Sequence, residues 1–204
     1  MTDTRSFGIE ISRKVLHLCT AGIPLAYAFV DDVDVMLWLL SACVVFAVAV
    51  ELLRHNNARF QAIFRRWVGF MVRDGEWGRV CGATYVLVAS LISIWLFPKP
   101  VAIAVLLILT VSDTAASLIG QRYGRTRFLG KSPAGSFAFF VTAVAILWVA
   151  LPGSRGIAFT AAIVVTLAEA LPVLKLGRFE LNDNLTIPLL TGAVIHFLQM
   201  HVGQ

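Results

Sequence analysis

The chain is 204 residues long; 58% of its residues are hydrophobic and only 14% are charged. This composition excludes ordinary soluble globular usage and predicts an integral membrane protein. The net charge of +5 is weak evidence on its own, and we expect no nucleic-acid partner. No hydrophilic stretch is long enough for a separate soluble domain, so we expect one polytopic all-α membrane domain over residues 1–204.

About seven apolar runs approach the roughly 20 residues that a helix needs to cross a bilayer core about 30 Å thick. We expect membrane-spanning helices at about residues 9–30, 33–53, 80–97, 101–120, 133–151, 157–175 and 185–202. The polar segment 54–79 holds six arginines. Its Phe60, Phe64, Trp67 and Met71 recur at helical spacing, which predicts an amphipathic helix lying in the membrane interface.

The basic residues predict the orientation of these helices. Fifteen of the 17 Lys and Arg residues fall on the N-terminal segment and on alternate loops, whereas Lys99 and Arg155 lie on the other side. By the positive-inside rule, the N-terminus is cytoplasmic and, after seven spans, the C-terminus is outside. We expect the protein in a bacterial or archaeal cell membrane, with its active site on the cytoplasmic face.

Carboxylates at the predicted spans are the first candidate catalytic residues. Asp113 and Glu169 lie in the fourth and sixth predicted helices, and Asp183 opens the seventh, all in the cytoplasmic half. Carboxylates in apolar helices are costly and therefore indicate a functional site. The alternative is that each pairs with a nearby arginine for packing or topology. The residues expected to support the site from the same side are Lys14, His17, Glu51 and Arg54.

The stretch 112–136 combines an aspartate, two glycines four residues apart and a basic loop. Cationic side chains neutralise phosphate oxygens, glycines allow close backbone approach, and amides at a helix start can face an anion. The candidate phosphate-binding residues are Gly120, Arg122, Gly124, Arg125, Arg127, Lys131, Ser132 and Gly135. Two alternatives stay open, since a glycine pair also serves helix packing in membranes and a basic loop also binds anionic lipid headgroups.

These groups together suit magnesium and a phosphate ligand. Mg²⁺ takes carboxylate oxygens and usually keeps substrate phosphates in its shell. We therefore expect Asp113 and Asp183 to hold Mg²⁺, with Asn184 as a supporting ligand or nucleotide contact. Such a site faces cytoplasmic nucleotide on one side and lipid on the other, which fits chemistry between a soluble phosphate donor and a membrane-dissolved acceptor.

The sequence DTAASLIGQRYGRTRFLGKSPAGS resembles the loop of the CTP-dependent lipid kinases. This family includes dolichol, phytol and diacylglycerol kinases and is distantly related to phosphatidate cytidylyltransferase. Asp113, Ala116, Gly120 and Gly124 match the register of the family's loop, and EISRKVLHLCTAG and EALPVLKLGRFELNDNLTIPL look like its opening and closing segments. Ala134 stands where dolichol kinases and cytidylyltransferases usually place Glu. Phytol kinases are similar to this chain there, so the nearest resemblance is to phytol kinase-like isoprenoid alcohol kinases.

The resemblance implies phosphoryl transfer from CTP to the hydroxyl of an isoprenoid alcohol such as phytol, farnesol, geranylgeraniol or a polyprenol. We expect the basic loop to bind the triphosphate and Glu169 to accept the alcohol proton, with His17 and Asp113 as rival bases. The alternatives are a CTP-dependent diacylglycerol kinase, a phosphatidate cytidylyltransferase, and a non-catalytic lipid transporter or scaffold.

Overall fold

A computed structural model shows how the chain folds. It describes residues 14–69, 78–124, 131–170, 175–176, 179–180 and 182–202. Arg125 and Arg127 of the basic loop, and the expected start of the first helix at residue 9, lie outside the described residues.

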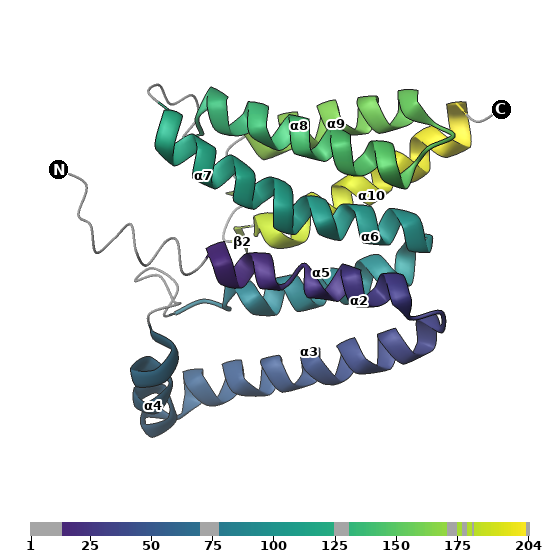
Figure 1. Ribbon diagram of the computed structural model, residues 1–204. Helices are drawn as coiled ribbons and strands as arrows, with labels where there is room; N and C mark the ends of the chain where they lie inside the picture. Colours follow the sequence, from purple (N-terminus) through teal and green to yellow (C-terminus); the bar gives the residue numbers. More distant parts are fainter. Residues whose placement is uncertain are drawn as a thin grey trace.

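The chain forms a bundle of helices that run between two ends of the molecule (Figure 1). An apolar helical segment, Lys14–Phe29, opens the described chain and has a turn at residues 20–21. Its second part is α2, and the elements then follow in the order α2 (Gly22–Phe29), α3 (Val33–Asn56), α4 (Ala58–Val68), α5 (Gly82–Leu96), α6 (Lys99–Leu107), η3 (Ile108–Ser112), α7 (Asp113–Tyr123), α8 (Pro133–Ala150), α9 (Arg155–Ala170), β1 (Lys175–Leu176), β2 (Phe179–Glu180) and α10 (Asp183–Val202).

Local signals in the sequence determine several helix starts. Asp32 and Asn57 cap α3 and α4, because their side-chain oxygens accept hydrogen bonds from first-turn amides that have no partner within the helix. Ser132 caps α8 in the same way, with its Oγ accepting a hydrogen bond from the Gly135 amide at 3.0 Å. Pro133 begins α8, where a missing N–H leaves no bond unmade.

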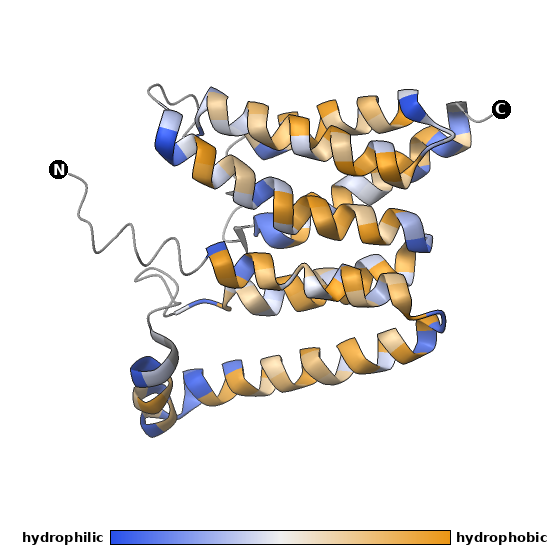
Figure 2. Cartoon of the chain, in the orientation of Figure 1, coloured by the Kyte–Doolittle hydropathy of each residue, from blue (hydrophilic) through white to orange (hydrophobic). Residues whose placement is uncertain are grey.

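Within the described residues, three helices are long and apolar enough to cross a membrane: Val33–Asn56, Lys99–Tyr123 and Pro133–Ala150. Figure 2 shows hydrophobic residues along the lengths of the helices and hydrophilic residues near their ends. Large apolar side chains also stand exposed, with Trp38 78% and Val149 83% accessible. Such a surface suits contact with lipid, so the structure supports the prediction of a helical membrane protein. The count of seven spans stays a prediction.

The core of the bundle lies where α6, α8, α9 and α10 meet. Leu109 of η3, Phe139 of α8, Ala161 of α9 and Ile195 of α10 are all fully buried. Small residues on α9 allow close packing against α8 and α10, both of which it contacts. Helix α3, by contrast, lies at the edge of the bundle and packs against α5 and α4 (Figure 1).

One prediction on secondary structure was wrong. The helix expected over 157–175 ends at Ala170, and Lys175 lies in β1, which pairs with β2 in a short antiparallel ladder. Among the described residues, this ladder is therefore the one pair of strands in an otherwise helical fold. The physical reason is Pro172, because a proline disfavours helical backbone at the residue before it and lacks the N–H that a helix needs. The last helix begins at Asp183, the residue that the sequence analysis placed at its opening.

Candidate active site

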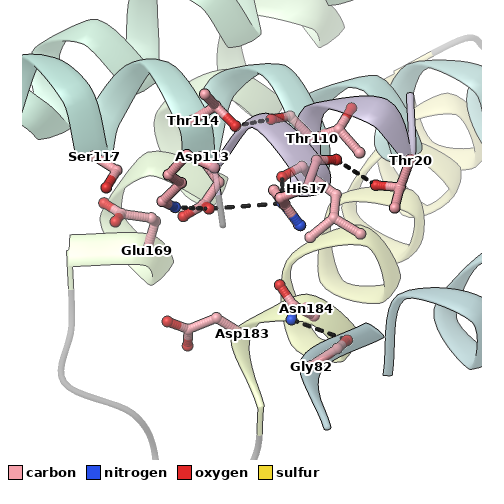
Figure 3. A network of polar contacts seen from close by, with 12 residues as sticks. His17, Thr20, Gly82, Thr110, Asp113, Thr114, Ser117, Glu169, Asp183 and Asn184 are labelled. Carbon is pink, nitrogen blue, oxygen red and sulfur yellow. Dashed lines mark hydrogen bonds and ion pairs between the residues drawn. The ribbon is translucent and has the colours of Figure 1, made fainter. Parts of the chain in front are cut away.

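Three carboxylates from different helices gather at one end of the bundle. Asp113 is the first residue of α7, Glu169 is the second-last residue of α9, and Asp183 is the first residue of α10. Figure 3 shows their side chains around a common region, with Asn184 beside Asp183. The structure therefore brings together the carboxylates that the sequence placed on one side of the membrane.

Asp113 binds two residues of the first described helix. Lys14 Nζ donates to Asp113 Oδ2 at 2.6 Å, and His17 Nε2 lies 3.7 Å from the same oxygen. His17 Nε2 also lies 3.0 Å from the carbonyl oxygen of Leu109. A carbonyl oxygen can only accept, so His17 Nε2 is the donor in this contact. This geometry disfavours His17 as a proton acceptor at that nitrogen and supports its role as a partner of Asp113.

A π-helical segment, η3, precedes Asp113 directly and was missed from the sequence. The expected helix over 101–120 is continuous in direction, but its residues Ile108–Ser112 form i→i+5 turns. Such segments are rare and often occur at functional sites, because they displace the side chains that follow. Ser112 Oγ is buried here without a hydrogen-bond partner among the described residues. No residue type in this segment marks a π turn, so the sequence carried no usable signal.

Lys131 connects the other two carboxylates. Its Nζ donates to Glu169 Oε1 at 2.6 Å and lies 3.8 Å from Asp183 Oδ2. Burial lowers the pKa of Lys131, but its hydrogen bond to Glu169 and the negative charges of Glu169, Asp183 and Asp113 outweigh that effect and hold the pKa above its ordinary value. Lys131 therefore keeps its charge at neutral pH. Among the described residues, lysines rather than arginines pair with Asp113 and Glu169, so the alternative of arginine pairing is not seen in this part of the chain.

Glu169 has an unused carboxylate oxygen. Its side chain is only 3% exposed, and Oε1 accepts the bond from Lys131. Oε2 is buried and has no hydrogen-bond partner within the described residues. A buried anionic oxygen without a donor is unfavourable unless a ligand supplies a hydrogen bond or a positive charge. Oε2 is therefore the one described carboxylate oxygen at this site that is both desolvated and unpaired.

Asn184 is held by the start of α5. Its Nδ2 donates to the carbonyl oxygen of Gly82 at 3.3 Å, across 102 positions in the chain. Its backbone N–H is bonded to Oδ1 of Asn182. These two bonds fix Asn184 next to Asp183, whose side chain is 46% exposed. The amide side chain is thus oriented by the protein and lies at the border between the carboxylates and solvent.

The glycines of the basic stretch mediate close contact between α7 and α8. A Cβ on Gly120 would lie 2.8 Å from Ser132 Oγ, and a Cβ on Gly135 would lie 2.7 Å from the carbonyl oxygen of Ala116. A Cβ on Gly124 would overlap the carbonyl oxygen of Gly120. These contacts show that close packing of α7 against α8 leaves no room for a side chain at these positions. Helix packing is the alternative role of the glycines considered from the sequence. Their role in phosphate binding stays a prediction.

We expect Gly135→Ala to destabilise the protein. The new methyl group would meet the backbone oxygen of Ala116, which cannot move without shifting α7, so the free energy of unfolding should fall by about 1–3 kcal/mol. Thermal unfolding in detergent measures the effect. Gly153→Ala is the matched control, because a Cβ there has no atom within 4 Å. Equal melting temperatures of the two variants would contradict the packing explanation.

The remaining predicted residues lie around this cluster. Arg122 is exposed near the end of α7, with its guanidinium over the Tyr123 ring at 5.7 Å. Glu51 and Arg54 bind each other at the end of α3, and Glu51 accepts a hydrogen bond from Cys81 at the start of α5. The described residues contain no group of three or more His, Cys, Asp and Glu side chains suited to a metal. Magnesium at phosphate sites is usually bound by one or two carboxylates plus phosphate oxygens, so Asp113 and Asp183 fit that requirement.

Comparison with known proteins identifies relatives along most of the chain. The uncharacterized protein RP860 of Rickettsia prowazekii is 30% identical over 191 residues, covering 91% of this chain and 93% of that protein. The CTP-dependent diacylglycerol kinase 1 of Saccharomyces cerevisiae is 32% identical over 145 residues, covering 69% of this chain. The dolichol kinase of the same yeast is 28% identical over 198 residues, covering 92% of this chain. No protein-family model matches the chain, and no solved structure matches it.

The chain belongs to one family with RP860 and is a homologue of the CTP-dependent lipid kinases. It spans 50% of the length of the yeast diacylglycerol kinase and 37% of the yeast dolichol kinase. The homology agrees with the kinase family that the loop sequence resembles. The particular closeness of this lipid-kinase homologue to phytol kinases stays a prediction.

Proposed function

We propose that this lipid-kinase homologue transfers the γ-phosphoryl group of CTP to the hydroxyl of a membrane-dissolved lipid alcohol. The observation that carries the proposal is Glu169 Oε2, a buried carboxylate oxygen that has no donor among the described residues and lies next to Lys131. The alcohol hydroxyl donates to Oε2, loses its proton to it, and its oxygen attacks the γ-phosphorus while the bond to the β-phosphate oxygen breaks. The products are the lipid monophosphate and CDP.

Positive charges on the donor side offset the negative charge of the phosphates. Lys131 has three N–H donors, of which two face Glu169 and Asp183, so the third is available for a phosphate oxygen. Arg122 lies on the same stretch of chain, and Arg125 and Arg127 complete the proposed cationic set. Further contacts with the nucleotide are assigned to Gly120, Gly124, Ser132, Gly135 and Asn184.

Asp113 and Asp183 are the residues that would hold Mg²⁺. Both present carboxylate oxygens, the ligand type that magnesium prefers, from helices that meet at the site. When bound, the ion neutralises phosphate charge as the phosphoryl group is transferred. Lys14 holds Asp113 by an ion pair, and this pairing fixes the carboxylate at the start of α7.

The acceptor that we propose is an isoprenoid alcohol, from the resemblance of the segment around Ala134 to phytol kinases. Diacylglycerol is the second candidate, because three of the fungal relatives are CTP-dependent diacylglycerol kinases. Both acceptors offer a hydroxyl on a hydrocarbon body, as the site requires. We further propose a single domain with seven spans and a cytoplasmic active site, following the basic residues.

The test uses purified protein with CTP labelled in either the γ- or the α-phosphate. The acceptors are farnesol, geranylgeraniol, phytol, a polyprenol, diacylglycerol and phosphatidic acid. We expect γ-label in the lipid product of an isoprenoid alcohol, with magnesium present. Label from the γ-phosphate in phosphatidic acid would instead select the diacylglycerol kinase. Label from the α-phosphate in lipid would select a cytidylyltransferase, and no label in any lipid from folded protein would contradict the proposal.

A further inference from the structure

A buried ion pair closes the end of α3, outside the carboxylate cluster. Arg54 is 1% exposed and Glu51 is 8% exposed. Both Nε and Nη2 of Arg54 donate to Glu51 Oε2, the Nε contact being 3.1 Å long. The planar guanidinium thus binds one carboxylate oxygen through two donors, which fixes its orientation.

This pair joins α3 to α4, which follows it directly in the chain, and to the segment before α5. Arg54 Nη2 also donates to the backbone carbonyl of Arg79, and the guanidinium lies over the Phe64 ring of α4 at 5.6 Å. Glu51 Oε1 accepts a hydrogen bond from the Cys81 amide at 2.8 Å. The pair therefore attaches both the amphipathic helix α4 and the segment before α5 to the end of α3.

The segment before α5 continues directly to the candidate active site. Cys81 is the N-cap of α5, and the next residue, Gly82, accepts the side-chain hydrogen bond of Asn184 through its carbonyl oxygen. A Cβ on Gly82 would lie only 3.1 Å from Asn184 Nδ2, so the two residues are in close contact. A shift of Cys81 would thus move the group that orients Asn184.

Stability alone is a weak reason for this arrangement. Burying two charges costs several kcal/mol of desolvation that their attraction often fails to recover. Arg54 Nη1 adds to the cost, since it is buried without a partner in the part of the chain that the structure describes. The pair does fix the positions of Arg79 and Cys81 relative to α3, because its hydrogen bonds connect both residues to the end of that helix.

We propose that the Glu51–Arg54 pair positions Asn184, acting through the N-terminus of α5. Glu51 and Arg54 are positioning residues here, and Asn184 is the residue that meets the nucleotide. The inference deepens the proposed function and rests on it for the role of Asn184. It also links α4, which we predict to lie on the membrane surface, to the nucleotide side of the active site.

The kinetic test is a double-mutant cycle between Arg54→Lys and Asn184→Ala. A lysine cannot reproduce the two bonds to Glu51 together with the contact to Phe64. We therefore expect KM for CTP to rise about 10- to 100-fold, the range for residues that orient a ligand-binding side chain. The double variant should be no worse than Asn184→Ala alone, because both changes act on one contact. Arg59→Lys, the same change on an exposed residue of α4, is the matched control. Additive losses would overturn the inference.

A second measurement needs no activity. Amide hydrogen exchange of Arg54→Lys should increase at residues 79–86 and 182–186, while residues 155–170 stay as in the unchanged protein. Exchange that increases only at 79–86 would overturn the inference. If the unchanged protein phosphorylates no lipid but the exchange pattern appears, the proposed function fails and the positioning role stands. If Arg54→Lys does not fold, Glu51→Gln is measured in its place, because its amide oxygen can still accept the bond from Cys81 while its amide nitrogen cannot accept the two bonds from Arg54.

Discussion

Asp113→Asn is expected to lower kcat/KM for CTP-dependent lipid phosphorylation by at least about 1000-fold, the upper range for removal of one preorganised electrostatic contact. Asparagine keeps the shape of the side chain but removes its negative charge. Lys14, which is only 14% exposed, then faces a neutral oxygen, and the proposed Mg²⁺ loses one of its two carboxylates. Initial rates with γ-labelled CTP measure the first effect, and electron paramagnetic resonance of Mn²⁺ binding measures the second.

The matched control for this change is Asp34→Asn. Asp34 lies in the first turn of α3, at the opposite end of that helix from Glu51 and Arg54. We expect wild-type rates from the control, since it removes the same charge far from the site. Asp113→Asn with near-wild-type turnover, or with unchanged Mn²⁺ binding in the presence of CTP, would remove Asp113 from the proposed metal site.

Glu169→Gln is expected to reduce kcat about 10²- to 10⁴-fold, the usual contribution of a general base, with a much smaller change in KM for CTP. The glutamine amide is nearly isosteric, so the buried space stays filled. It cannot accept a proton at neutral pH, and the partner of Lys131 at 2.6 Å loses its negative charge. Rapid-quench measurements of a single turnover with γ-labelled CTP separate the chemical step from binding of the nucleotide.

A second substitution at the same position distinguishes catalysis from folding. Glu169→Asp keeps the charge but withdraws the carboxylate by one methylene, so it should restore stability more fully than activity. Thermal unfolding of both variants reports on the ion pair with Lys131. If Glu169→Gln loses stability but keeps kcat, Glu169 serves only to balance Lys131, and His17 and Asp113 return as candidate bases.

Pattern reasoning located most helices because apolar length and end signals are local properties of a chain. The expected helices at 33–53, 80–97 and 133–151 agree with α3, α5 and α8 to within three residues. One of the failures also had a local cause. The helix expected from residue 157 was extended past Pro172, although a proline predicts that a helix ends before it. The π segment before Asp113 has no such marker, because packing around it rather than residue type stabilises it.

The sequence also placed the carboxylates on one side of the membrane, but it could not choose their partners. Pairing of each carboxylate with a nearby arginine was the alternative considered from the sequence, and among the described residues the structure pairs Asp113 with Lys14 and Glu169 with Lys131. Lys14 and Asp113 are 99 positions apart, so their contact depends on how the first and fourth helices pack. Side-chain pairing across such separations is a property of the assembled bundle.

Composition, apolar length and the distribution of charge by themselves determined that this protein is a helical membrane protein with acidic residues at one end of its helices. These properties follow from each segment's free energy of transfer into lipid, which depends only on the residues in that segment. Only the tertiary structure decided that Glu169 Oε2 is buried without a partner in the described part of the chain and that α5 holds Asn184. Both depend on where neighbouring helices lie, because desolvation and hydrogen bonding are decided by the atoms that surround a group.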